Sequence, residues 1–287
     1  MNMIDLHMHT TVSDGTDAPE EIILRVKEAG LSVFSVTDHD AVKGCAIIQE
    51  KLRPGDPEFL CGVEFSTKDE KGMYHILGYG YNPASEAIKE TIRHGHSLRM
   101  EKLRARLDFI RDTFDIRLPE EAVRELFSQD NPGKPHIANL MVKYGYAESK
   151  DQAIRNYLNR FHMPNAYVRP EEAIKAILAG NGIPVLAHPF YGNGDQLILG
   201  DEMVLRLLHL MDFGLQGVEA FYSGFSPKMR EEILALADRY SLYVTAGSDY
   251  HGKNKMVSLG DTGLDAEKRL PGGMLRFFEA VRKTPTK

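Results

Sequence analysis

Cysteine is scarce in this sequence of 287 residues, which contains only Cys45 and Cys61. Two thiols are too few for a disulfide framework or a thiolate zinc site, so we expect two reduced, buried side chains. No apolar run reaches the roughly 18 residues that a membrane span requires, and the histidine-rich N-terminal segment lacks the apolar stretch of a signal peptide. Internal repeats and low-complexity tracts are also absent. The sequence therefore predicts a globular, cytoplasmic protein that does not span a membrane.

Charge is unevenly distributed along the chain. The net charge is -6, yet residues 93–169 hold 14 Lys and Arg against 10 Asp and Glu. A basic segment of this kind favours an anionic ligand, but it is also typical of a solvated helical surface. Charge alone does not separate these two interpretations.

Short apolar runs alternate with amphipathic stretches at both ends of the chain. The first run, over residues 3–8, predicts a strand, and Pro19 and Gly30 mark the start and the end of the helix that follows. Further strands are predicted over residues 32–40, 59–67, 74–81, 183–189, 217–222 and 242–249. Helices are predicted over residues 41–52 and from about residues 170, 202, 227 and 273. This alternation predicts an α/β fold, a parallel βα barrel.

The middle of the chain has only helical patterns. They cover residues 85–114, 118–127, 135–146 and 150–161, with no strand between them. We therefore expect a discontinuous barrel domain, residues 1–92 and 169–287, and an all-helical insertion that caps it, residues 93–168.

Histidines and carboxylates gather at the ends of the predicted strands. His7 and His9 are two residues apart, a spacing that places both side chains on one face of a strand. Asp249 and His251 repeat this spacing, whereas His75 lies near a strand start, where a lone histidine is more often a core residue. Because the chemistry of such barrels lies at the carboxyl ends of the strands, and burying these groups unpaired is costly, their convergence predicts a metal site.

Six segments of the sequence occur in an order that resembles a known family. They are "DLHMHTTVSDGT", "SVTDHD", "GVEFST", "HILGY", "LAHP" and "GSDYHG". This combination resembles the PHP (polymerase and histidinol phosphatase) domain of metal-dependent phosphoesterases over nearly the whole chain. The resemblance implies a distorted TIM-like (β/α)7 barrel. The helical insertion with "GKPHIANLM" is similar to the subgroup that acts on small nucleotides and RNA ends.

The resemblance also implies two to three divalent metal ions, for which mixed nitrogen and oxygen ligands favour manganese, iron or zinc. The implied ligands of the first ion are His7, His9, Glu64 and Asp249. Those of the second are Glu64, shared with the first, His75 and His188. Those of the third are Asp14, His39 and His251, with aspartate at a position where some relatives have histidine.

Asp38 and Asp40 flank a proposed ligand and are the candidate catalytic residues, since such carboxylates orient a histidine or hold a substrate group. Asp40 is also compatible with a helix cap. The segment "GKPHIA" is similar to "GRPHIA" in the subgroup, and its lysine would hold phosphate as a point charge without the bidentate fork of arginine. The candidate substrate-binding residues are Lys134, His136, Arg99, Tyr222 and Ser248.

These observations predict a metal-dependent phosphoric ester hydrolase that uses metal-bound hydroxide. Its substrates would be small phosphorylated molecules such as AMP, 3′,5′-nucleoside bisphosphates or short RNA 5′ ends, and no obligate protein partner is evident. A histidinol-phosphate phosphatase is an alternative, against which the insertion argues. A non-catalytic metal-binding module is another, against which the complete ligand set argues. An amidohydrolase-like enzyme would often use a carboxylated strand lysine, and none is found.

Overall fold

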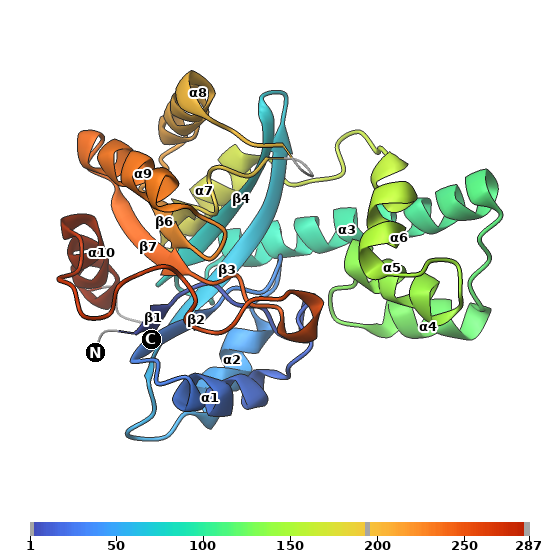
Figure 1. The fold of residues 1–287 in the computed structure, drawn as a ribbon, viewed down its shortest axis with the longest axis horizontal. Coiled ribbons are helices and arrows are strands. Elements are labelled where there is room, and N and C mark those ends of the chain that lie inside the picture. Colours follow the sequence, from blue (N-terminus) through green and yellow to red (C-terminus); the bar gives the residue numbers. More distant parts are fainter. Residues whose placement is uncertain (1–2, 193–195, 284–287) are drawn as a thin grey trace.

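The computed structural model describes residues 3–192 and 196–283. Seven strands form one sheet in which neighbours follow the order of the chain, and the sheet curls into a nearly closed barrel (Figure 1). The edges approach each other where the amide of Leu6 donates to the carbonyl of Ala246 at 2.8 Å. The strands are β1 (Ile4–Asp5), β2 (Val33–Val36), β3 (Glu58–Asp69), β4 (Gly72–Tyr79), β5 (Ile183–Leu186), β6 (Gly217–Tyr222) and β7 (Tyr243–Gly247).

Helices cover the outer face of the barrel. They are α1 (Pro19–Glu28), α2 (Lys43–Lys51), α7 (Pro170–Ala179), α8 (Gly200–Asp212), α9 (Pro227–Arg239) and α10 (Gly272–Lys283). Each buries an apolar face, as α7 does with Ala173, Ile174 and Ile177, because amphipathic helices gain stability mainly by packing that face against the sheet. In the described part of the chain, no helix is both long enough and apolar enough to cross a membrane.

Strand β4 runs against its neighbours, so the prediction of an all-parallel barrel is wrong at this strand. It is antiparallel to both β3 and β5, whereas the other pairs are parallel. The reason is the short connection, since only Glu70 and Lys71 separate β3 from β4. Two residues can close a hairpin, but a parallel pair needs a crossover of about a dozen residues. The (β/α)7 class itself is confirmed.

Strand β1 is shorter than predicted. It covers only two residues, whereas the prediction covered residues 3–8. Beyond it the chain stays beside the continuation of β7, through a bridge between Met8 and Tyr250 and a hydrogen bond of 2.8 Å from the amide of His9 to the carbonyl of Tyr250. His7 and His9 therefore lie on an extended segment at the rim of the barrel.

The helical insertion lies to one side of the barrel (Figure 1). Its longest helix, α3 (Glu86–Phe114), begins against the barrel core with Ile88 and reaches the insertion, where Leu103 and Ile110 join a separate apolar core. The chain returns beside β3, where the amide of Lys68 donates to the carbonyl of Val168 at 3.0 Å. The remaining elements are α4 (Glu120–Ser128), α5 (Lys134–Lys143), α6 (Lys150–Asn156) and η1 (Leu158–Arg160), and η2 (Gly252–Asn254) follows β7. The domain boundaries at residues 93 and 168 stay a prediction.

Candidate metal centre

The side chains predicted as metal ligands meet at one rim of the barrel. Most of them follow the carboxyl end of a strand, as parallel βα units require. His75 reaches the same rim because β4 is reversed, so the start of this strand lies beside the ends of the others. The side chains brought together are His7, His9, Asp14, His39, Glu64, His75, His188, Asp249 and His251.

Glu64 is the centre of this cluster. Its Oε2 lies 3.3 Å from Nε2 of His7, 3.1 Å from Nε2 of His9 and 3.2 Å from Nδ1 of His39. Its Oε1 lies 2.9 Å from Nδ1 of His75 and 3.3 Å from Nε2 of His188. Burial alone would raise the pKa of Glu64, but the surrounding imidazoles hold that pKa well below its usual range. A single ionised carboxylate therefore contacts five imidazoles.

Asp249 and Asp14 complete the cluster. Oδ1 of Asp249 lies 3.4 Å from Nε2 of both His7 and His9, and Oδ1 of Asp14 lies 3.2 Å from Nε2 of His251. Burial acts to raise the pKa of each carboxyl, but nearby basic side chains hold both pKa values well below the usual range, Lys255 foremost at Asp249 and His251 foremost at Asp14. Three ionised carboxylates thus share one rim.

Among the described residues there are three groups of potential ligand atoms, and inside each group the atoms lie within 4.8 Å of one another. The first group contains the predicted ligands of the first site except Glu64. The second has His39 in place of the predicted His188, and the third adds His9 to the predicted ligands. His188 lies outside these groups although it contacts Glu64. The groups are His7, His9 and Asp249; His39, Glu64 and His75; and His9, Asp14, His39 and His251.

The centre also contains buried polar atoms that lack a hydrogen-bond partner. They include Nε2 of His7, Nε2 of His9, Oε2 of Glu64 and Nδ1 of His75. Buried polar groups in folded proteins are nearly always satisfied, and leaving several unsatisfied at one point is costly. Cations bound between these nitrogen and oxygen atoms would satisfy them, so the residues present fit a divalent metal centre.

Two further buried carboxylates hold segments of the candidate metal centre in place by hydrogen bonds. Neither was predicted from the sequence. Oε1 of Glu219 lies 3.0 Å from Nδ1 of His7, and Oε2 accepts from the amide of His188 at 2.8 Å. Asp5 accepts from the amide of Ser248 at 2.9 Å, and burial raises the pKa of Asp5 to about 6. A charged residue inside the apolar strand "GVEAFY" was a sequence signal that would have identified Glu219.

Asp38 and Asp40 organise the loops around the centre. Asp38 accepts from the amide of Thr10 at 2.8 Å and from Oγ of Ser13 at 2.6 Å. Asp40 pairs with Arg99 at 2.5 Å and accepts from the amide of Ser66. In the described part of the chain, neither carboxylate forms a hydrogen bond with an imidazole.

The candidate substrate-binding residues lie in different surroundings. The hydroxyl of Tyr222 donates to Oδ2 of Asp249 at 3.0 Å and accepts from Nζ of Lys255 at 2.8 Å. Ser248 is fully buried. Nothing in the sequence pattern identified Lys255, because it follows the last motif in a loop. Its ammonium lies 2.5 Å from Oδ2 of Asp249 and brings a positive charge to the edge of the centre.

The insertion places two further candidates at the start of α5. Nδ1 of His136 accepts from the amide of Gly133 at 3.0 Å, and Nζ of Lys134 donates to Oδ1 of Asn159 at 2.9 Å. A hollow of about 510 Å³ opens beside Asp14 and His251 and separates the centre from the insertion on one side.

A barrel with a rim of imidazoles and carboxylates around Glu64 is the architecture of a metal-dependent hydrolase. A model of the PHP domain matches residues 5–252, so the chain belongs to the PHP domain family and is a metal-dependent phosphoesterase. This result confirms the family resemblance and the fold class predicted from the motifs.

Three known proteins illustrate the similarity. The chain is 31% identical over 263 residues to the 3′,5′-nucleoside bisphosphate phosphatase of Chromobacterium violaceum, over 88% of each chain. It is 29% identical over 265 residues to the 5′-3′ exoribonuclease Rnm of Escherichia coli, over 89% of this chain and 87% of the other. It also resembles the crystal structure of a proposed metal-dependent phosphoesterase from Bifidobacterium adolescentis, with a TM-score of 0.80, 27% identity and 96% of both chains covered.

Proposed function

We propose that this phosphoesterase hydrolyses phosphate esters of nucleotides, with AMP, a nucleoside 3′,5′-bisphosphate or the 5′ end of a short RNA as substrate. The observation that carries the proposal is the contact of one buried, ionised carboxylate, Glu64, with five imidazoles. The nucleotide substrates of the related phosphatase and exoribonuclease support the substrate class. We also propose that the protein is cytoplasmic and acts without an obligate protein partner.

In this proposal the nine side chains gathered at the rim hold two to three divalent ions, manganese, iron or zinc. When bound, such ions lower the pKa of a coordinated water and neutralise charge on phosphoryl oxygens. Glu219 fixes the ring of His7 so that Nε2 faces Glu64 and Asp249. Lys255 adds a positive charge beside the centre, which favours a phosphate anion.

The remaining acidic residues hold the loops that carry the ligands. Asp38 fixes the loop from Thr10 to Ser13, which precedes the candidate ligand Asp14. Asp40 joins Arg99 of α3 to the backbone of Ser66. We therefore assign Asp38 and Asp40 as positioning residues, which act on the reaction through their neighbours.

The test is a substrate panel run with purified protein of known metal content. AMP, adenosine 3′,5′-bisphosphate, a 5′-phosphorylated short RNA and histidinol phosphate are compared, with Glu64→Ala as the variant and exposed Glu90→Ala as the control. We expect Glu64→Ala to lose at least roughly 1000-fold in kcat and to lose bound metal, because the shared carboxylate is gone. The control should match the wild type in both.

Two results would contradict the proposal. Near-normal turnover by metal-analysed Glu64→Ala protein would remove the bridging role of this carboxylate. A preference of the wild type for histidinol phosphate over every nucleotide would contradict the proposed substrate class. If no ester were hydrolysed, the protein would be a metal-binding module without catalytic activity.

A further inference from the structure

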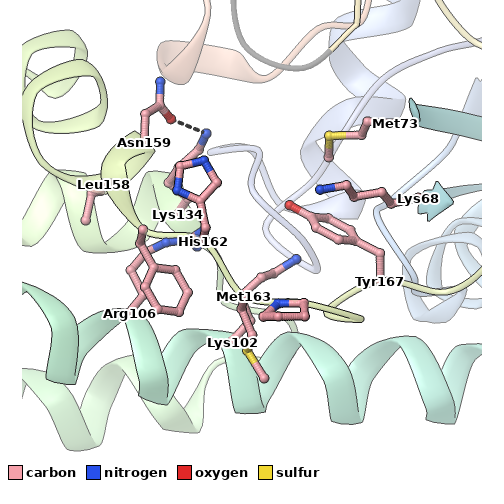
Figure 2. Close-up of a pocket in the computed structure, with 12 residues that line it drawn as sticks. Lys68, Met73, Lys102, Arg106, Lys134, Leu158, Asn159, His162, Met163 and Tyr167 are labelled. Carbon is pink, nitrogen blue, oxygen red and sulfur yellow. Dashed lines mark hydrogen bonds between the residues drawn. The ribbon is translucent and has the colours of Figure 1, made fainter. Parts of the chain in front are cut away.

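Two hollows lie between the barrel and the insertion. One, of about 510 Å³, opens beside Asp14 and His251. The other, of about 530 Å³, is shown in Figure 2, where Lys68 lies on the side of the barrel and Lys134 on the side of the insertion. Because open space limits direct packing at both places, the contacts that join the insertion to the metal centre can be traced to individual side chains.

The first of these side chains is Asn131, in the loop between α4 and α5. Its Nδ2 donates to the backbone carbonyl of His39, a candidate ligand. Asn131 is only 2% exposed, and its Oδ1 is buried without a hydrogen-bond partner among the described residues. Beside it, Nζ of Lys43 donates to Oδ2 of Asp130 at 2.7 Å. Two successive residues of the insertion therefore hold the loop that carries His39.

The second side chain is Asn254, in η2 after β7. Its Nδ2 donates to the carbonyl of Asp14 at 2.8 Å, and its backbone amide donates to the carbonyl of His251 at 3.2 Å. From the insertion, Nζ of Lys150 on α6 donates to the carbonyl of Asn254 at 3.1 Å, and Nδ2 of Asn139 on α5 lies 3.5 Å from its Oδ1. Asn254 therefore joins the insertion to two candidate ligands.

The three carbonyls held in this way belong to members of one group of potential ligands. The members of this group are His9, Asp14, His39 and His251. We propose that the insertion determines the affinity of this group for its ion, with Asn131 and Asn254 as the positioning residues. The inference rests on the metal centre of the proposed function, and it assigns one ion of that centre to the docking of the insertion.

The other candidate ligands are supported from inside the barrel. Glu219 of β6 lies 3.0 Å from Nδ1 of His7 and accepts from the amide of His188. Glu64 and His75 lie on the paired strands β3 and β4. A movement of the insertion would leave these side chains in place. Its effect should therefore fall on one ion and spare the rest of the centre.

Holding a backbone carbonyl fixes the direction of the side chain on the same residue. Without the amide of Asn131 or Asn254, the carbonyl of His39 or of Asp14 loses that donor, and the loop relaxes to satisfy it elsewhere. Partners that orient a ligand typically change metal affinity by about tenfold or more. Since coupling between two binding events is reciprocal, the bound ion should in turn hold the insertion against the rim.

The test measures the metal content of purified protein after dialysis against graded concentrations of a chelator. For Asn131→Ala and Asn254→Ala we expect the affinity for one ion to fall about tenfold, while the other ions are held as in the wild type. Asn156→Ala, at an exposed position of α6, is the matched control and should behave as the wild type does. Unchanged content in either variant, or equal weakening of every ion, would overturn the inference. A wild type that retains no metal would instead contradict the proposed centre itself.

Hydrogen exchange separates positioning from a general loss of stability. In EDTA-treated Asn131→Ala, amides of residues 37–44 should exchange about tenfold faster than in the wild type, and those of β6 should not change. Faster exchange throughout the barrel would count against a positioning role. Because Asn254 is only half-buried, Asn254→Ala should fold normally, and its metal content decides the question if Asn131→Ala does not fold. In the wild type, added Mn²⁺ should slow exchange over residues 128–138, and equal rates with and without the ion would overturn the coupling.

Discussion

Among single residues, Glu219 shows how a side chain at some distance from the proposed ions determines the geometry of the centre. It is fully buried on β6, and its two oxygens accept from different segments, the ring of His7 and the backbone of His188. By holding Nδ1 of His7, it leaves Nε2 free to face Glu64 and Asp249. Such partners of a ligand are worth about 10- to 100-fold in metal affinity.

We predict that Glu219→Gln weakens metal binding about 10- to 100-fold, because glutamine keeps one acceptor oxygen and loses the other. Competition with a chromogenic chelator would measure the affinity, and circular dichroism would show that the barrel is intact. Exposed Glu231→Gln on α9 is the matched control and should bind metal as the wild type does. Unchanged affinity of Glu219→Gln would contradict the positioning role.

Much of this centre could be predicted from spacing and motif order, and the parts that could not have a physical reason. His7 and His9, two residues apart on an extended segment, converge as predicted. Lys255 approaches Asp249 only because the loop after β7 folds back on the rim, a long-range contact that local patterns do not contain. Glu219, in contrast, is a charged residue inside an apolar strand, and this local pattern is sufficient to predict a functional or structural role for it.

At the scale of elements, the close approach of β7 to the extended segment after β1 determines where His7 lies. A Cβ atom on Gly247 would lie 2.2 Å from Cβ of His7 and 2.3 Å from Oε1 of Glu219. No side chain fits at this crossing, so glycine at the end of β7 allows His7 and Glu219 to meet.

Gly247→Ala should therefore separate His7 from Glu219. We expect the free energy of unfolding to fall by about 1 to 3 kcal/mol, as for other overpacked cores, together with a loss of bound metal. Urea denaturation and metal analysis would measure both. Gly272→Ala at the start of α10, where the nearest atom would be the end of the Arg276 side chain at 3.6 Å, should leave stability and metal content unchanged. Equal behaviour of the two variants would contradict this account of the crossing.

The reversal of β4 could not be predicted from hydrophobic patterns. The apolar runs at residues 59–67 and 74–81 report which parts of β3 and β4 are buried. The two strands of the hairpin extend further, through Lys68, Asp69 and Gly72. These polar and small residues do not continue the apolar pattern, so the pattern does not show that the strands continue. The apolar runs therefore predicted two strands, but they did not predict the two-residue turn that makes the strands antiparallel.

Across the whole molecule, the basic residues in the middle of the chain lie in two kinds of surroundings that net charge could not separate. Some of its cations form surface pairs, as Arg111 does with Asp108 and Asp112. Other basic residues, including Lys102 and Arg106, line a cavity of about 530 Å³ between the barrel and the insertion, and have no carboxylate oxygen within 4 Å among the residues that the structure describes. The interpretation as a solvated surface therefore holds for the first set of residues, and the interpretation as an anion-binding region stays a prediction for the second.

The unpaired cations should reduce stability, and Lys102 offers a test with a defined sign. Its pKa falls from 10.5 to about 6 on folding, mainly by burial, so between these values the unfolded chain holds one more proton. Lys102 therefore destabilises the fold most at low pH and progressively less as pH rises toward about 10.

We predict that Lys102→Met raises the free energy of unfolding by about 1 kcal/mol at pH 7, and that its advantage over the wild type narrows by pH 9. Urea titrations at several pH values would measure both effects. Lys89→Met, an exposed position on the same helix, should follow the pH dependence of the wild type. An advantage of Lys102→Met that grows with pH would contradict the assignment.

The centre takes side chains from segments far apart in the sequence, beginning with His7 before β2 and ending with His251 after β7. During synthesis on the ribosome, His7 and His9 emerge early, while Asp249 and His251 emerge only after β7. A nascent chain thus offers an incoming ion isolated histidines for most of its translation, and full coordination waits for the final strand to dock. We therefore expect metal loading to follow the docking of β7, late in the maturation of this enzyme.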